Sequence, residues 1–226
     1  LTGEGMSFRQ AFCPGVTCVA SRAAIFTGQY PHNTGVYSFN AWGHHRTWVH
    51  DLADSGYFCA SVGKMHLLPN NENGGFHDRI IVENPADGTS WTDAGEDDWG
   101  KFLNLHGIPR PHERRKHDPE WMKKYQGLAW EYEERFHSDV FTGDAAVGFL
   151  RQHRTEKPFF LEVGLPGPHE PWDPPQRFID LYAEADWPDP VDRGNDFDTR
   201  PPQHKAQQDL MAPPSDGALF HDSHID

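Results

Sequence analysis

The sequence predicts an α/β fold in which a mainly parallel central sheet is covered by helices on both faces. Two observations carry this prediction: a helical pattern leads into an apolar strand at residues 46 to 63, and the same order recurs at residues 138 to 165. Nearly continuous apolar strands that alternate with amphipathic helices are typical of parallel sheets buried on both faces. Ligands of such sheets bind beyond the carboxyl ends of the strands.

The first unit begins with RTWVHDLADSG and continues with YFCASVG. Its helix is predicted to end at Gly56, because glycine is a frequent helix stop, and to bury four apolar residues at helical spacing (Trp48, Val49, Leu52 and Ala53). The mostly apolar run that follows has the length of a strand. KMHLLPN, directly after it, is predicted to be an extended loop.

The second unit repeats this order, with SDVFTGDAAVGFLRQH as the helix and KPFFLEVGL as the strand. The helix is expected to bury one apolar face (Val140, Phe141, Val147 and Leu150). The loop after this strand, PGPHEPWDPP, is expected to lie beside KMHLLPN, because parallel strands end at the same edge of a sheet.

A further helix is predicted from Cys18 to Phe26, with Gly28 as its stop. Cys18 then lies near the positive end of the helix dipole, and Arg22 falls one turn later on the same face. Both features favour an anion beside Cys18. A cysteine considered alone is more often a small buried side chain.

The remaining stretches lack clear periodicity. Residues 70 to 135 are polar and aromatic, with several tryptophans, and are interpreted as an insertion that shapes the rim of a pocket (Trp91, Trp99, Trp121 and Trp130). Residues 186 to 226 are rich in proline and aspartate, which suits a long surface loop or linker.

Composition excludes some classes of partner. The 226 residues carry a formal net charge of −14, which argues against a nucleic-acid groove. A small anionic substrate would need a local cationic pocket. No run of residues approaches the ~20 apolar residues of a membrane span.

Three polar residues follow the two predicted strands. Lys64 and His66 are one residue apart, and His169 lies in the second loop. Each has an ordinary explanation, as an exposed lysine or a hydrogen-bonded loop histidine. Together with Cys18 and Arg22 they form a set that an α/β sheet would gather at one edge, which favours a catalytic site.

These residues carry a resemblance to the formylglycine-dependent sulfatases, the type I sulfatases of the alkaline phosphatase superfamily. CVASRAAIFTG is similar to the family's signature, in which cysteine is followed two positions later by proline or alanine, then by Ser-Arg and Thr-Gly. GQYPHNTGVY resembles its continuation, GKMHL resembles the Gly-Lys-aromatic-His loop, and KPFFLEVGLPGPHEPW resembles the strand and loop with the later histidine.

The resemblance implies an alkaline-phosphatase-like sandwich that hydrolyses sulfuric esters. Residues 1 to 185 would be part of a sulfatase catalytic domain. Cys18 would be oxidised by a formylglycine-generating enzyme, and its hydrate would supply the nucleophile and contact a divalent metal, most commonly Ca²⁺. The substrate would be a small-molecule or saccharide sulfate ester.

The resemblance also implies a role for each of the other four residues. Arg22 would stabilise the ionised hydrate, and Lys64 would bind the hydrate or the sulfuryl group. His66 would help remove the second hydroxyl proton, whereas His169 would contact the sulfate and protonate the leaving oxygen.

The match has three departures. Ala20 stands where many members have proline, which leaves open how efficiently Cys18 is converted, and Met65 replaces the common aromatic residue. Before Cys18 the only acid is Glu4, whereas the family has an aspartate pair there. The chain is therefore interpreted as an internal fragment that lacks its first strand and C-terminal part, with weak metal binding and little or no turnover.

Two alternatives remain open. One is a phosphonate monoester or phosphodiester hydrolase of the same superfamily, for which Mn²⁺ or Zn²⁺ would also be suitable. The other is a non-catalytic remnant domain that keeps the sheet. The compartment is open as well, with periplasmic, secreted and cytoplasmic locations all compatible with the sequence.

Overall fold

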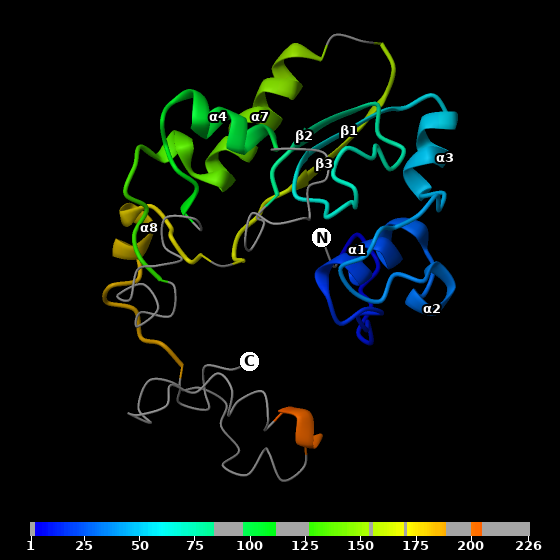
Figure 1. Cartoon of the computed structure of the whole chain (residues 1–226), viewed down its shortest axis with the longest axis horizontal. Coiled ribbons are helices and arrows are strands. Elements are labelled where there is room, and N and C mark those ends of the chain that lie inside the picture. The colour runs from blue at the N-terminus through cyan, green and yellow to red at the C-terminus, as the bar shows by residue number, and fades with distance from the viewer. Residues whose placement is uncertain are drawn as a thin grey trace.

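A computed structural model shows a three-stranded sheet with helices grouped at its two sides (Figure 1). It describes residues 3–83, 97–111, 127–153, 156–169, 171–188 and 200–204. Most of the predicted linker at residues 186 to 226 lies outside this part of the chain. No helix among the described residues has the length and apolar character needed to cross a membrane.

The sheet is parallel and has the order β2-β1-β3. Its central strand, β1 (Phe58–Gly63), pairs residue for residue with β3 (Phe159–Gly164), as the two predicted units require. On its other side β1 pairs with β2 (Asp78–Ile81), a strand that the sequence did not predict. Four residues are too few to show a periodicity, so only pairing with β1 reveals β2.

Helices cover both faces of this sheet. On one face Phe160 packs against Trp48 of α3 (Trp48–Asp54), with 5.1 Å between ring centroids. On the other face Phe149 of α7 (Ser138–Gln152) stacks on Phe58 and contacts Phe159 edge to face, with 6.2 Å and 5.6 Å between ring centroids. Neighbouring residues of a strand point to opposite faces, so these contacts confirm the predicted fold class.

The predicted helix at the signature is confirmed as α1 (Cys18–Thr27). Thr17 is its N-cap, and the Thr17 hydroxyl accepts a hydrogen bond from the Ala20 amide at 3.4 Å. Gly28 ends the helix in the left-handed conformation, with φ 68°, and its amide donates to the Ala24 carbonyl. The apolar side of α1 joins the core cluster of α3 and β1 (Val19, Ala23 and Phe26).

The predicted face of α7 is partly wrong. Thr142 and Ala146, one turn apart, are its buried residues, and Val147 and Leu150 are 43% and 52% exposed. Thr142 approaches the backbone at Gly63, so small side chains face the sheet and let the helix lie close to it. The other two expected positions, Val140 and Phe141, are partly buried.

A second core cluster lies beside the sheet and includes several described residues of the stretch interpreted as an insertion. It joins α4 (Asp98–Leu105) to the segment before α7, which contains the short helix η1 (Glu134–Phe136). Its buried members are large and apolar (Val82, Trp99, Leu103, Ile108, Trp130 and Phe136). Trp91 and Trp121 lie outside the described residues. Two further short helices, α2 and α8, cover Pro31–Thr34 and Gln176–Asp180.

Candidate active site

Three of the predicted site residues, Lys64, His66 and His169, lie in the loops that follow the carboxyl ends of two strands. β1 ends at Gly63, which is followed at once by Lys64, and β3 ends at Gly164, five residues before His169. The Lys64 amide donates to the Gly164 carbonyl at 2.7 Å, so the two loops leave the sheet side by side. Because both strands are parallel, the two predicted loops meet at one edge, as expected.

Arg22 ties α1 to this edge. Its Nη1 donates a hydrogen bond to the Lys64 carbonyl at 2.6 Å. Cys18, at the first position of α1 and one turn before Arg22, is partly buried against the adjacent core. Lys64 itself is only 2% exposed, so its ordinary explanation as a solvated lysine is wrong. A buried lysine needs anionic or polar partners, which is what a site for an anion provides.

His66 is held in an unusual backbone conformation. Its φ of 58° lies in the left-handed region, so the loop is not extended there, in contrast to the prediction. The side chain is 16% exposed. Burial is the main cause that lowers the pKa of His66, and together with the positive charges of Lys64, Arg22 and His169 it brings that pKa to about 3. Four of the five predicted residues therefore lie within electrostatic reach of one another.

Acid should destabilise the protein through His66. Histidine in the unfolded chain has a pKa of 6.5, whereas the folded value is about 3, so between these values only the unfolded chain binds the proton. The free energy of unfolding is expected to fall as the pH drops below about 6.5, by up to about 1.4 kcal/mol per pH unit from this residue. Urea unfolding between about pH 7 and about pH 5 measures the slope.

His66→Asn should show a shallower slope than the wild type, because it removes this titration. His44→Asn, at an exposed position, is the matched control and should keep the wild-type slope. Equal slopes for wild type and His66→Asn would contradict the prediction.

Glu83 is a site residue that sequence reasoning missed. Its Oε1 accepts hydrogen bonds from the amides of Met65 (3.1 Å) and His66 (2.7 Å), and its Oε2 lies 3.4 Å from His66 Nε2. Burial raises the pKa of the Glu83 carboxyl, and the two amide hydrogen bonds oppose that rise. Glu83 follows β2 by two residues, so recognising that strand would have placed it at the same edge of the sheet.

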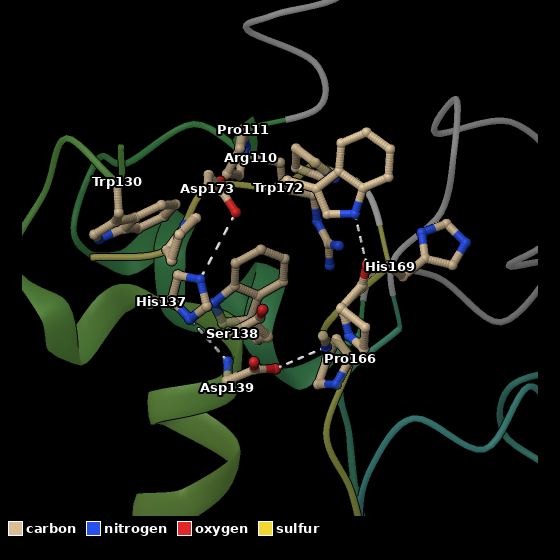
Figure 2. Close-up of a pocket in the computed structure, with 15 residues that line it drawn as sticks. Arg110, Pro111, Trp130, His137, Ser138, Asp139, Pro166, His169, Trp172 and Asp173 are labelled. Carbon is tan, nitrogen blue, oxygen red and sulfur yellow. Dashed lines mark hydrogen bonds and ion pairs between the residues drawn. The ribbon is translucent and has the colours of Figure 1, made fainter. Parts of the chain in front are cut away.

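A cavity of about 300 Å³ opens next to this edge (Figure 2). Its lining is rich in aromatic side chains (Trp99, Trp130 and Trp172) and includes Arg110, Asp139 and His169. Figure 2 shows His169 at the edge of the cavity, on the side away from Trp130. The cavity therefore adjoins His169, the predicted catalytic histidine. The stretch from 70 to 135 contributes Trp99 and Trp130 to the lining.

Hydrogen bonds hold the shape of this cavity. The Trp172 indole donates to the Pro168 carbonyl at 2.8 Å, and the Gly167 amide donates to Asp139 Oδ1 at 2.9 Å, as the dashed lines in Figure 2 mark. His137 Nε2 lies 3.7 Å from Asp173 Oδ1, and both residues line the cavity. These contacts join the start of α7 to the loop that carries His169, so the two walls are fixed relative to each other.

The described residues do not form a metal site on their own. Across residues 3–83, 97–111, 127–153, 156–169, 171–188 and 200–204, no three histidine, cysteine or acidic side chains gather closely enough to hold an ion. The ligand set implied by the resemblance is therefore not present in this part of the chain. The predicted contact between Cys18 and a metal stays a prediction.

The structure places the chain among α/β proteins with a parallel sheet, and the polar cluster lies at the carboxyl edge of that sheet. A family model described as Sulfatase matches residues 1–209. The chain therefore belongs to the sulfatase family. It is 28% identical over 204 residues to an arylsulfatase of Clostridium perfringens, a match that covers 83% of this chain and 41% of the relative.

Another curated relative is an N-acetylglucosamine-6-O-sulfatase of Bacteroides thetaiotaomicron, 24% identical over 88% of this chain and 31% of its own length. The chain thus spans less than half the length of these relatives. Two solved structures share the fold with a TM-score of 0.58 each. One, at 21% identity, is in complex with its substrate D-glucosamine-2-N,6-O-disulfate and is covered over 34% of its length, with 88% of this chain matched. The other is a phosphonate monoester hydrolase of Agrobacterium radiobacter, at 19% identity, with 88% of this chain and 39% of that chain covered.

Proposed function

We propose that the full-length protein hydrolyses a sulfate monoester, with Cys18 converted to formylglycine by a formylglycine-generating enzyme. The observation that carries the proposal is the clustering of Lys64, His66 and His169 around Arg22, which lies one turn after Cys18 in α1. Membership of the sulfatase family supports the same chemistry. In its converted form Cys18 supplies an aldehyde hydrate, whose one hydroxyl attacks sulfur and whose other hydroxyl, once deprotonated, allows sulfate to leave.

Two cations meet the charge of the sulfate group. The protein as a whole carries a net charge of −14, so a sulfate ester is attracted only where positive groups are concentrated. Arg22 and Lys64 supply that local charge, since the Arg22 guanidinium reaches the backbone of Lys64 and both interact electrostatically with His66. Fixed donors of this kind stabilise the negative oxygens that develop during attack on sulfur.

The two histidines divide the proton transfers. His66 is neutral at physiological pH, because its pKa is about 3, so its imidazole can accept the proton of the second hydroxyl. His169 borders the cavity, where the alcohol part of the ester would lie, and is suited to donate a proton to the leaving oxygen. One histidine thus serves the release of sulfate and the other the release of the alcohol.

The cavity favours a saccharide as the alcohol. Tryptophan faces pack well against sugar rings, and Trp130 and Trp172 lie on its two sides (Figure 2). Asp139 adds a carboxylate that can accept hydrogen bonds from hydroxyl groups. The sulfated sugar of the structural relative fits this interpretation.

A divalent metal, Ca²⁺ by resemblance, belongs to the same proposal. The described residues do not supply a ligand set for this metal. The roles given above are therefore assigned only to side chains of the protein, and none of them depends on a metal ligand. Mn²⁺ or Zn²⁺ would be suitable for the phosphonate monoester or phosphodiester hydrolase alternative.

The test combines mass spectrometry with kinetics on the full-length protein, expressed together with a formylglycine-generating enzyme. The peptide across Cys18 should lose sulfur and gain an aldehyde, and an aryl sulfate should be hydrolysed faster than a phosphodiester. A clear preference for the phosphodiester would overturn the sulfatase assignment in favour of the other hydrolase. An intact thiol together with no hydrolysis would favour the non-catalytic remnant.

A further inference from the structure

Glu83 contacts both the backbone and the side chain of the loop that carries His66. One carboxylate oxygen, Oε1, accepts the two amide hydrogen bonds of Met65 and His66, which closes the turn around the left-handed residue. The other oxygen, Oε2, is buried, accepts no hydrogen bond among the described residues, and lies 3.4 Å from His66 Nε2, which is an electrostatic contact. The amide hydrogen bonds fix the backbone position from which the His66 side chain extends. The contact of Oε2 places Nε2, rather than Nδ1, next to the carboxylate.

Glu83 is itself held on both sides of its backbone. Its amide donates to Asp97 Oδ2 at 2.7 Å, and its carbonyl accepts from Arg110 Nη1 at 3.1 Å. Asp97 and Arg110 also form an ion pair, and the Asp97 side chain is fully buried. Arg110 lines the cavity and lies over the Trp99 ring at 4.9 Å. The carboxylate of Glu83 therefore has little freedom to move away from His66.

The two ring nitrogens of His66 differ in their surroundings. A carboxylate oxygen only accepts hydrogen bonds and is negatively charged, so it favours a ring proton on the nitrogen that faces it, Nε2. His66 Nδ1 is buried and has no hydrogen-bond partner among the described residues. In a neutral imidazole with Nε2–H, Nδ1 keeps its lone pair. The buried ring thus presents one free acceptor atom.

We propose that Glu83 is a positioning residue that holds His66 as the Nε2–H tautomer, so that Nδ1 is the atom that accepts the proton. This role rests on the proposed function. In that reaction the hydroxyl proton passes to Nδ1, the electron pair of its O–H bond forms the carbonyl, and the bond to sulfate breaks with its pair on the departing oxygen. The proton then returns to solvent.

Glu83→Gln tests the tautomer directly. The two amide groups still require an oxygen at the position of Oε1, so the NH₂ of glutamine takes the place of Oε2 and faces His66 Nε2. An NH₂ group donates, which requires Nε2 to accept and moves the ring proton to Nδ1. The variant therefore keeps the hydrogen bonds that shape the loop but inverts the tautomer of His66.

Long-range ¹H–¹⁵N correlation spectra of the ¹⁵N-labelled protein report which imidazole nitrogen is protonated, with His66 identified by the signals lost in His66→Gln. We expect Nε2–H in the wild type and Nδ1–H in Glu83→Gln. The matched control is Glu162→Gln, which alters another carboxylate of the sheet, bonded to Ser61 at 2.8 Å, and should leave the His66 tautomer unchanged. Wild-type His66 protonated at Nδ1 overturns the proposal, even if the variant does not fold.

Kinetics supply the second readout. Glu83→Gln should lower kcat for the sulfate ester by at least about tenfold with little change in KM, because substrate binding groups are untouched. Unchanged kcat, or an unchanged tautomer in the variant, overturns the positioning role while the proposed function stands. If the wild type hydrolyses no sulfate ester but the tautomer inverts as expected, the positioning of His66 by Glu83 is supported and the proposed function fails.

Discussion

Replacing Cys18 with alanine is expected to lower the hydrolysis of a sulfate ester by about four orders of magnitude or more. Alanine cannot be converted to formylglycine, so the variant lacks the nucleophile, and loss of a nucleophile removes most of the rate enhancement of an enzyme that works through a covalent intermediate. The fold should persist, because Cys18 is the first residue of α1 and only partly buried. Initial rates with an aryl sulfate measure the effect in full-length protein expressed with the maturation enzyme.

Cys13→Ala is the matched control for this variant. Cys13 lies five residues earlier, is exposed, and contacts the Ser21 hydroxyl at 3.1 Å rather than the cluster around Lys64. Its replacement should leave the rate within about twofold of the wild type. Activity of Cys18→Ala close to that of Cys13→Ala would rule out Cys18 as the precursor of the nucleophile.

Replacing Gly63 with alanine is expected to lower the free energy of unfolding by about 3 kcal/mol or more. Gly63 has φ 110°, which a residue with a side chain rarely adopts. An added Cβ would also lie far inside van der Waals contact with the Gly164 carbonyl of β3, whose partner is the amide of Lys64. The substitution therefore strains the backbone and pushes apart the two loops that carry the proposed site. Urea unfolding followed by circular dichroism measures the change.

Gly148→Ala provides the comparison. Gly148 lies inside α7, and a Cβ added there meets no other atom within 4 Å. Alanine is favoured over glycine in a helix, so this variant should unfold with a free energy equal to the wild type or up to about 1 kcal/mol higher. If Gly63→Ala has a free energy of unfolding as high as that of Gly148→Ala, the sheet edge tolerates a side chain at Gly63, and the prediction is wrong.

The five site residues differ in how far the structure supports their joint prediction. Arg22 donates a hydrogen bond to the Lys64 carbonyl. The positive charges of Arg22, Lys64 and His169 contribute to the lowered pKa of His66. Cys18 lies at the start of α1 and packs against the adjacent core cluster. Their catalytic roles stay predictions, which the variants and the mass spectrum described above test.

Glu83 shows why sequence patterns miss some residues of a site. A single acid after a short polar and apolar stretch carries no periodicity and no motif. It becomes visible only once β2 is seen to pair with β1, because that pairing brings Glu83 beside the turn at His66. The same holds for Asp97 and Arg110, whose interaction with Glu83 joins segments 14 and 27 residues apart in the chain.

The sequence by itself determined the elements that local physics controls. The helix stop at Gly28, the apolar strand at residues 58 to 63 and the order of helix, strand and loop follow from spacing, backbone preference and burial of neighbouring residues. The parallel arrangement follows as well, because it is the way such units bury both faces of their strands.

Only the tertiary structure decided the features that depend on distant contacts. The buried face of α7 follows from its close approach to Gly63, which favours Thr142 over the larger Val147. The left-handed turn at His66 and the burial of Lys64 depend on Glu83 and on the neighbouring strand β3. Such features arise where segments far apart in sequence compete for the same space and the same hydrogen bonds, and no local pattern records the outcome of that competition.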